Sequence, residues 1–315
     1  MRSEGKIYHD DWMNNGLPDK SVQLIIADPP YYKVKGDFDF VWKTFEDYLQ
    51  DVERWAIECK RVLADNGTLY WYGDAKNIAY AQIIFDKHFN LLNSLVWENT
   101  NDHKQQIRFN TDLRTFAPLT ERLLMYSNET YNLTQCVYHI RDYIRAEIEK
   151  AKGKIILKEI NEALGTATNG GGVASACLSL DKTEPAMFTK EMYEKLQIWC
   201  YPYLGKEYEA LRKEYEALRR PFNNERFYGD VIRLPNYETG NHEHDTPKPE
   251  KLTRALILTC SRKNDLVVVP FAGSGTEMAM SIKEGRKAIG YDIEKKYVDM
   301  SNARIKTFKD ASTLF

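Results

Sequence analysis

The sequence predicts an α/β protein with one central sheet, helices on both faces of that sheet, and a helical insert within the sheet-forming chain. Three observations lead to this fold class. Strand-like apolar runs alternate with amphipathic helical patterns in residues 1–135, and the same alternation returns in residues 228–315. Residues 136–227, by contrast, show mainly helical patterns. We therefore expect the two ends of the chain to build one sheet together.

Residues 1–135 predict a parallel arrangement, because a helix that connects two strands returns the chain to the same edge of the sheet. The expected elements, in chain order, are a strand in VQLIIAD, a helix in FEDYLQDVERWAIECKRVL, a strand in GTLYWYG, a helix in IAYAQIIFDKHF, and strands in LLNSLVWEN and ERLLMYS.

Residues 136–227 predict several helices. YHIRDYIRAEIEKA flows into KIILKEINEALG, the loop TATNGGG follows, and the helices KEMYEKLQIWCYPYL and KEYEALRKEYEALRRPF come last. The heptapeptide KEYEALR occurs twice in succession and sets Tyr208, Leu211, Tyr215 and Leu218 at heptad spacing. Two heptads are too few for a coiled coil, so we expect a packed helix.

Residues 228–315 resume the alternation. A loop with His, Asn and Pro leads to a helix in EKLTRALILTCS, a strand in DLVVVPF, the glycine turn AGSG, a helix in TEMAMSIKEG, a strand in KAIGYDI and a closing helix.

Composition excludes some classes of protein and leaves others open. No apolar run is long enough to span a bilayer and the start lacks a signal-peptide pattern, so we expect a cytoplasmic location. The five cysteines are scattered without zinc or redox spacing, which favours buried thiols. The net charge of −2 does not indicate a nucleic-acid partner. Locally, residues 141–158 hold six basic and three acidic residues, although a solvated helix face explains that segment equally well.

The glycine turn has the arrangement that a nucleoside-bearing cofactor needs. Gly273 and Gly275 allow positive backbone dihedrals and close approach of a ligand, and the helix that starts near Thr276 offers free amides. Asp292, at the end of the following strand, is placed to hold ribose hydroxyls. GSG alone is more often a plain turn, but Phe271 before it and Asp292 after it favour a binding role.

The stretch ADPPY, residues 27–31, ends the leading strand of the sheet. The two prolines fix the backbone and aim their carbonyl groups. A carboxylate from Asp28 and a carbonyl from Pro29 could accept both hydrogens of an adenine amino group and direct its lone pair toward a methyl donor. Tyr31 could stack on the base. A strand-ending turn without function is an equal alternative for these residues alone.

Three motifs, ADPPY, HDTPKP (244–249) and PFAGSGT (270–276), follow in an order that resembles the amino-methyltransferases of the beta arrangement. The resemblance covers nearly the whole chain. It implies a permuted Rossmann-like methyltransferase sheet, S-adenosylmethionine as the cofactor, and methylation of the N6 amine of adenine in double-stranded DNA. Residues 1–135 would then be the catalytic part and 228–315 the cofactor-binding part. It also implies a bacterial or phage origin and no metal.

The resemblance implies roles for individual residues. The catalytic motif corresponds to Asp28, Pro29, Pro30 and Tyr31. The expected cofactor contacts are Asp11 for the adenine ring, with Asp10 as a competitor, Asp28 for the ammonium group, Thr246 and Lys248 for the carboxylate, Phe271, Gly273, Ser274 and Gly275 in the turn, and Asp292 for the ribose.

One position departs from the family pattern. Members usually carry Asp before Pro-Phe, and Val269 occupies that place here. We expect Asp28 to take more of the contact with the ammonium group, and a Val269→Asp replacement to tighten cofactor binding.

The middle region resembles the insert of phage-like and prophage-like adenine methyltransferases, which implies a helix-turn-helix-like target-recognition part, 136–227. Residues 166–179 would face base edges, and nearby lysines would meet phosphates. A bundle that only braces the catalytic part is the alternative. The expected DNA contacts are Lys152, Lys154, Lys158, Thr166, Thr168, Asn169 and Ser175.

Two rival functions stay open. One is methylation of the N4 amine of cytosine, or of RNA; the other is a non-catalytic DNA-binding module on the same fold. Double-stranded DNA is the expected partner, while a homodimer and a cognate restriction endonuclease, as in restriction-modification, remain open.

Overall fold

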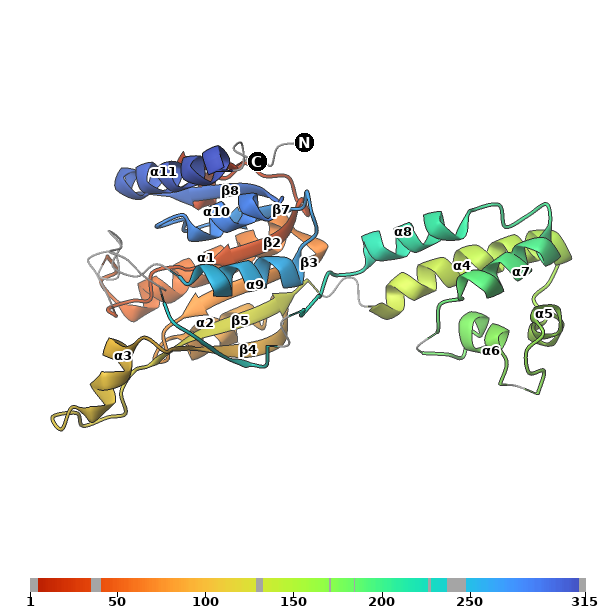
Figure 1. Cartoon of the computed structure of the whole chain (residues 1–315), viewed down its shortest axis with the longest axis horizontal. Helices are drawn as coiled ribbons and strands as arrows, with labels where there is room; N and C mark the ends of the chain where they lie inside the picture. The colour runs from red at the N-terminus through yellow and green to blue at the C-terminus, as the bar shows by residue number, and fades with distance from the viewer. Residues whose placement is uncertain are drawn as a thin grey trace. The chain divides into compact units, whose positions relative to one another are not determined.

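The computed structural model describes residues 5–34, 41–128, 133–169, 171–183, 185–225, 228–236 and 248–311. The chain forms two compact units (Figure 1). The first unit combines Met1–Glu129 with Pro221–Phe315, and the second is Thr130–Arg220. Each unit is described separately below.

The first unit is built on one mixed sheet to which both ends of the chain contribute, and the α/β prediction is confirmed. Its described strands run in the order β1-β8-β7-β2-β3-β5-β4-β6. Their bounds are β1 (Gly5–His9), β2 (Val22–Ala27), β3 (Leu63–Gly73), β4 (Asn90–Asn99), β5 (Thr120–Ser127), β6 (Val231–Leu234), β7 (Leu266–Val269) and β8 (Lys287–Asp292).

The strand β5 makes the sheet mixed, so the expectation of parallel strands throughout residues 1–135 was wrong. β5 pairs antiparallel with both β3 and β4, whereas the other described pairs are parallel. The segment between β4 and β5 carries only the short helices α3 (Asp102–Gln106) and η3 (Ile107–Phe109). Without a crossover helix the chain turns back, so β5 begins at the edge where the parallel strands end.

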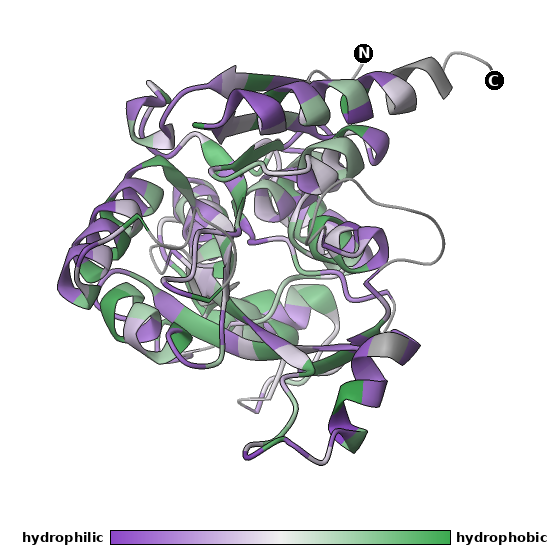
Figure 2. Cartoon of the chain, turned by 90° about the vertical axis from the view of Figure 1, so that its left-hand side faces the viewer, coloured by the Kyte–Doolittle hydropathy of each residue, from purple (hydrophilic) through white to green (hydrophobic). Residues whose placement is uncertain are grey.

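Helices cover both faces of the sheet, because the central strands are apolar on both sides and cannot face water. Leu24 and Ile25 in β2 point to opposite faces, and both are fully buried. Figure 2 shows hydrophobic residues concentrated in the strands, with both kinds of residue in the helices. On one face lie α1 (Phe45–Val62) and α2 (Ile78–Phe85); on the other lie α9 (Glu250–Cys260), α10 (Thr276–Lys283) and α11 (Lys295–Ala311).

The second unit is helical, as expected for the insert, but its helix bounds differ from the expectation. Its helices are α4 (Leu133–Lys152), α5 (Leu157–Leu164), α6 (Val173–Leu178), α7 (Lys190–Cys200) and α8 (Tyr208–Leu218). α4 and α5 are separate helices, and α6 lies within residues 166–179, the segment expected to face base edges. Most of the KEYEALR repeat, residues 206–219, forms the single helix α8, whose Leu211 and Tyr215 are buried in the core of this unit.

The connection from α5 to α6 is organised around the side chain of Asn161, which is 1% exposed. Its Oδ1 accepts hydrogen bonds from the Ala174 amide (2.8 Å) and the Thr166 hydroxyl (2.9 Å), and its Nδ2 donates to the Ser175 hydroxyl (3.4 Å). Gly172 passes so close that an added Cβ would lie 2.3 Å from Asn161 Oδ1, so no other residue fits there. The buried side-chain amide of Asn161 therefore holds the connection between α5 and α6 in place.

All five cysteines are buried thiols outside disulfides, in agreement with the expectation of buried thiols. Over the described part of the chain, no helix combines the length and apolar character needed to cross a membrane.

We expect Asn161→Ala to destabilise the second unit by about 2 to 4 kcal/mol, because it leaves the Ala174 amide buried without an acceptor. Amide hydrogen exchange of the full chain, read by mass spectrometry, should show faster exchange in α5 and α6. The exposed Asn169, replaced by Ala in the same connection, is the matched control. Unchanged protection in α5 and α6 of Asn161→Ala would contradict the structural role.

Candidate active site

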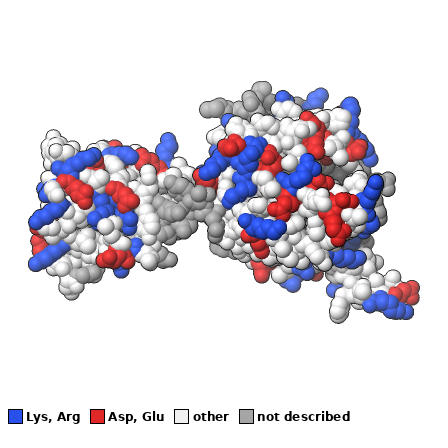
Figure 3. Space-filling view, turned by 180° about the vertical axis from the view of Figure 1, so that it is seen from behind, with Lys and Arg blue, Asp and Glu red and all other residues white. Residues whose placement is uncertain are grey.

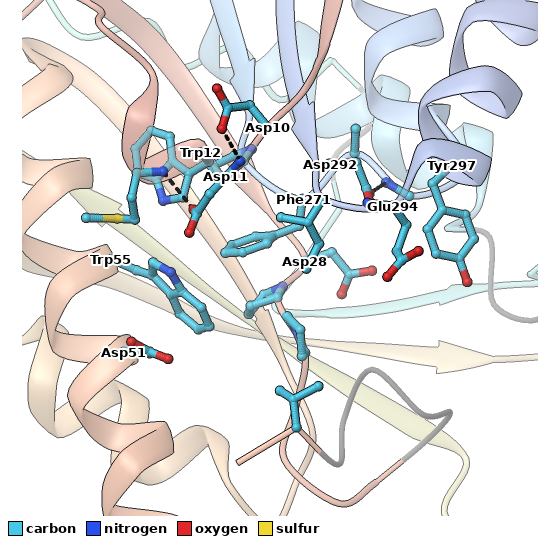
Figure 4. A pocket seen from close by; sticks show the side chains of 18 of the residues that line it. Asp10, Asp11, Trp12, Asp28, Asp51, Trp55, Phe271, Asp292, Glu294 and Tyr297 are labelled. Carbon is cyan, nitrogen blue, oxygen red and sulfur yellow. Dashed lines mark hydrogen bonds between the residues drawn. The ribbon is translucent and has the colours of Figure 1, made fainter.

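A cavity of about 370 Å³ opens at the carboxyl ends of the neighbouring strands β1, β8, β7 and β2. Chain order reverses where β7 meets β2, and such a switch point is where open α/β sheets bind ligands. Each strand contributes the residues that follow it directly: Asp10 and Asp11 after β1, Asp292 at the end of β8, Phe271 after β7, and Asp28 after β2 (Figure 4).

Two neighbouring acids after β1 line the cavity, and both are tied to the short helix η1 (Trp12–Asn14). Asp11 accepts a hydrogen bond from the Met13 amide at 2.9 Å and caps this helix. Asp10 accepts from the Asp11 amide at 2.8 Å and from the Asn14 side chain at 2.9 Å. The expected preference for Asp11 over Asp10 stays a prediction, because both residues line the cavity.

The glycine turn is locked to the acid at the end of β8. The Gly273 amide donates to one oxygen of Asp292 and the Glu294 amide to the other, each at 2.9 Å. Burial raises the pKa of Asp292. Gly275 has a positive φ of 74°, and a Cβ there would lie 2.5 Å from the Ser301 hydroxyl oxygen, which explains the glycine before α10.

Phe271 is held as a rigid wall of the cavity. Its ring packs edge-on against Trp55 of α1, with 5.0 Å between ring centroids, and against Trp71 of β3 at 6.3 Å. Trp55 also lines the cavity. An aromatic wall with carboxylates on either side suits a planar ring joined to polar hydroxyl groups.

A buried ammonium group lies at the other end of the cavity. The Nζ of Lys248 lies 2.7 Å from an Asp28 oxygen and 3.1 Å from a Glu121 oxygen, and it donates to the Tyr31 hydroxyl at 3.3 Å. The ring centroid of Tyr72 is 4.8 Å away. Burial lowers the pKa of Lys248, but the two carboxylates outweigh it, so the pKa is raised and the charge is kept.

The carboxylate of Asp28 has a second partner, the hydroxyl of Tyr31, which donates to its other oxygen. Tyr31 lines the cavity but is only 6% exposed. Burial, Asp28 and Glu121 together raise the pKa of Tyr31, so its hydroxyl stays protonated. Stacking of Tyr31 on a base remains a prediction.

The backbone after the proline pair adopts an unusual conformation. Tyr32 and Lys33 have positive φ values of 62° and 54°, which non-glycine residues rarely adopt. Asn77 holds this segment by donating its amide to the carbonyls of Tyr31 and Tyr32. The ring of Tyr32 stacks on Tyr48 of α1 at 5.6 Å. Strain of this kind persists only where the surroundings impose it, and it is common at functional sites.

The comparisons with known proteins agree with this geometry. Residues 22–303 match the family described as DNA methylase. The chain belongs to this family.

Two curated relatives of the methylase are similar over most of its length. It is 27% identical to the DNA adenine methyltransferase YhdJ of Escherichia coli (strain K12) over 92% of this chain and 78% of that protein. It is 25% identical to the type II methyltransferase M.HinfI of Haemophilus influenzae over 93% of this chain and 65% of that protein.

Two solved structures share the fold of the methylase. The PvuII DNA methyltransferase (cytosine-N4-specific) matches with a TM-score of 0.57 and 14% identity, over 98% of this chain and 92% of that one. The M1.HpyAVI-SAM complex matches with a TM-score of 0.51 and 16% identity, over 95% and 99% of the two chains.

The fold brings most of the expected cofactor and catalytic residues to one cavity. Asp11, Asp28, Pro29, Pro30, Tyr31, Lys248, Phe271, Gly273, Ser274 and Asp292 all line it. Gly275 is the N-cap residue of α10, and Thr246 lies outside the described residues. No group of three or more His, Cys, Asp or Glu side chains within the described ranges could hold a metal ion.

Two acids of the methylase site were missed by sequence reasoning. Glu121, near the start of β5, reaches Lys248 because β5 runs antiparallel. Glu277, the second residue of α10, lines the cavity and is 5% exposed. Burial and the nearby Asp28 raise the pKa of Glu277 to about 7. An acidic residue two positions after the glycine turn was a signal that could have found it.

Val269 does not line the cavity. It is 1% exposed and packs in the apolar cluster under α9 and α10. An aspartate there would be buried among apolar side chains, which disfavours folding. That Val269→Asp tightens cofactor binding therefore stays a prediction.

The expected DNA contacts divide into two groups. Lys152, Lys154, Lys158, Thr168 and Asn169 are exposed. Thr166 and Ser175 are only partly exposed, and both form hydrogen bonds with Asn161 inside the second unit, so a DNA contact by either residue stays a prediction.

Basic and acidic side chains are interspersed over the methylase surface seen in Figure 3. The distribution of charge on this face therefore does not by itself mark a DNA-binding surface.

Lys152 of the second unit also contacts an aromatic ring. Its Nζ lies 4.5 Å from the ring centroid of Trp199.

We expect Glu277→Gln to make the methylase more stable at pH 8. The pKa of Glu277 rises on folding from its ordinary 4.5 to about 7. Between these values the folded state keeps a proton that the unfolded chain releases, so the free energy of unfolding falls as pH rises toward 7. Glutamine does not ionise and removes this effect, so the free energy of unfolding at pH 8 should be about 3 kcal/mol higher in the variant than in the parent.

Urea unfolding of both proteins from pH 5 to pH 8 tests this. The difference in unfolding free energy between variant and parent should grow over that range. A constant difference would show that Glu277 is ionised throughout.

Proposed function

We propose that this DNA methylase transfers a methyl group from S-adenosylmethionine to the N6 amine of adenine in double-stranded DNA. The observation that carries the proposal is the position of Asp28. Its carboxylate follows β2 directly, faces the cavity, and lies between the glycine turn and the buried Lys248. The names of the curated relatives YhdJ and M.HinfI, a DNA adenine methyltransferase and a type II methyltransferase, support this activity and a restriction-modification setting.

The cavity suits the proposed cofactor in its chemistry. It combines an aromatic wall, carboxylates beside the glycine turn, and a charged end, as a nucleoside joined to an amino acid requires. The buried Nε1 of Trp12, which lines the cavity, has no hydrogen-bond partner among the described residues and could donate to a ligand. We assign the adenine ring to Asp11 or Asp10, the ribose to Asp292, and the carboxylate to Lys248 and Thr246. When bound, the cofactor supplies a methyl group activated by a positively charged sulfur.

The protein's own residues would prepare the adenine amine. Asp28 and the Pro29 carbonyl would accept its two hydrogens, which concentrates the lone pair on the nitrogen. Lys248 and Tyr31 hold the Asp28 carboxylate in place, so little reorganisation is needed at the moment of transfer. An adenine stacked in duplex DNA cannot reach Asp28, and the proposal therefore includes flipping of the base.

We further propose the second unit as the reader of DNA, with the exposed Lys152, Lys154 and Lys158 on phosphates and Thr168 and Asn169 near bases. Residues 1–135 and 228–315 are assigned the catalytic and cofactor-binding roles. A bracing bundle without DNA contacts is the alternative for the second unit. A homodimer and a cognate endonuclease stay predictions.

We expect Asp28→Ala to lower methyl transfer by about 100-fold or more, because the amine loses its charged acceptor. Mass spectrometry of nucleosides, after incubation of duplex DNA with methyl-labelled cofactor, should find N6-methyladenine with the parent and almost none with the variant. DNA affinity should change little. Asp19→Ala is the matched control, because Asp19 precedes β2 at the far end of that strand and its side chain is 75% exposed.

The same measurement separates the rival functions. Methylcytosine as the sole product would contradict adenine specificity. A parent protein that binds DNA but yields no methylated nucleoside would support the non-catalytic module and overturn the proposal.

We expect the triple replacement of Lys152, Lys154 and Lys158 by Ala to weaken DNA binding and its salt dependence. Each lost phosphate contact should reduce the slope of log affinity against log salt by about 0.9, or about 2.7 in total. Binding titrations at several salt concentrations test this. Replacement of Lys190, Lys195 and Lys213, exposed on α7 and α8 of the same unit, is the control. Equal slopes for both triple variants would favour the bracing bundle.

A further inference from the structure

The acid Glu277 is the least explained feature of the cavity. It belongs to α10, directly after the glycine turn, and its side chain is almost fully buried, yet it faces the cavity. Among the described residues it accepts a long hydrogen bond, 3.4 Å, from the Thr253 hydroxyl and one from its own backbone amide, and it forms no ion pair there. A buried carboxylate without a cation is unfavourable, and such a group is retained where a ligand completes it.

We propose that Glu277 binds the α-ammonium group of S-adenosylmethionine. This inference rests on the cofactor assigned in the proposed function. It names the residue that recognises the charged amino group of the methionine moiety.

The charge of the cavity favours a cationic ligand group near Glu277. Seven acidic residues line the cavity, against the two basic residues Arg54 and Lys248. Lys248 is already shared between the carboxylates of Asp28 and Glu121. An ammonium group from the ligand would therefore offset negative charge that the protein itself leaves uncompensated.

Asp28 is a poorer partner for the ammonium than the sequence suggested. One of its oxygens lies 2.7 Å from Lys248, and the other accepts the hydroxyl hydrogen of Tyr31. The proposed reaction also needs Asp28 to accept a hydrogen from adenine. Glu277 is free of these duties and lies beside the same turn.

The groups around Glu277 predict how binding depends on pH. Asp28 after β2 and Tyr72 of β3 face it, as do Lys248, Thr253 of α9, and Arg304 of α11. Burial and Asp28 keep its pKa near 7, so at pH 7 about half of the molecules carry a proton on Glu277. An ammonium group favours the carboxylate, so binding should release that proton.

Isothermal titration calorimetry of the full chain tests the assignment with two ligands. One is S-adenosylhomocysteine, which keeps the amino group, and the other is its analogue in which hydrogen replaces that group. At pH 8, Glu277→Gln should lower affinity for S-adenosylhomocysteine by about 10- to 100-fold, as expected for a lost charge-assisted hydrogen bond. Its affinity for the deaminated analogue should match the parent's. Glu284→Gln, at the end of α10 and paired with Arg254, is the control.

A second calorimetric measurement reports the proton. At pH 7, titration in buffers of different ionisation enthalpy should show release of about half a proton per bound S-adenosylhomocysteine with the parent, and almost none with Glu277→Gln. A purely structural role for Glu277 would not produce this difference.

The outcomes separate the inference from the function on which it rests. Equal losses for both ligands, or no loss for either, would overturn the role of Glu277 while the cofactor assignment stands. If the parent binds neither ligand, the cofactor assignment fails, and the proposed function and this inference fail with it.

Discussion

The ammonium group of Lys248 sets the central constraint on this structure. A charge that is removed from water must be matched by opposite charges nearby, or folding is strongly disfavoured. Here the match comes from Asp28, which directly follows β2, and from Glu121, the second residue of β5. These segments lie far apart in the sequence, so the site exists only when both ends of the chain share one sheet. The charged end of the cavity therefore forms only when the sheet is assembled.

The direction of β5 decides which acids reach this cluster. In a parallel sheet the residues that follow the strands gather at the carboxyl ends of those strands. For that reason sequence reasoning correctly placed four residues in a common cavity: Asp28, Phe271, Gly273 and Asp292. A residue at the start of a parallel strand would lie at the opposite edge. Glu121 reaches the cluster because β5 is reversed, and the alternation within a strand carries no information about its direction. The sequence therefore predicted the sheet and most of the cavity, but not this acid.

The second unit illustrates a different limit of sequence reasoning. Helical patterns predicted its helices, because apolar spacing is a property of each segment by itself. The connection from α5 to α6 depends instead on Asn161, whose amide is buried and bonds residues on both sides of Gly172. A polar residue in a helical pattern is usually exposed, so the sequence alone could not show that Asn161 is buried. The hydrogen bonds that Thr166 and Ser175 form with Asn161 could not be predicted from the sequence for the same reason.

An acidic cavity also bears on the direction of the proposed reaction. In the donor both the sulfur and the amino group are positively charged, whereas methyl transfer leaves the sulfur neutral. A cavity in which acidic residues outnumber basic residues therefore binds the positively charged sulfur of the donor more favourably than the neutral sulfur of the product. Glu277 adds to this preference, although its burial beside Asp28 makes the ligand-free protein less stable at neutral pH. The uncompensated charge of the Glu277 carboxylate thus destabilises the fold and also favours the cationic ligand. A trade-off between stability and function of this kind is common at binding sites.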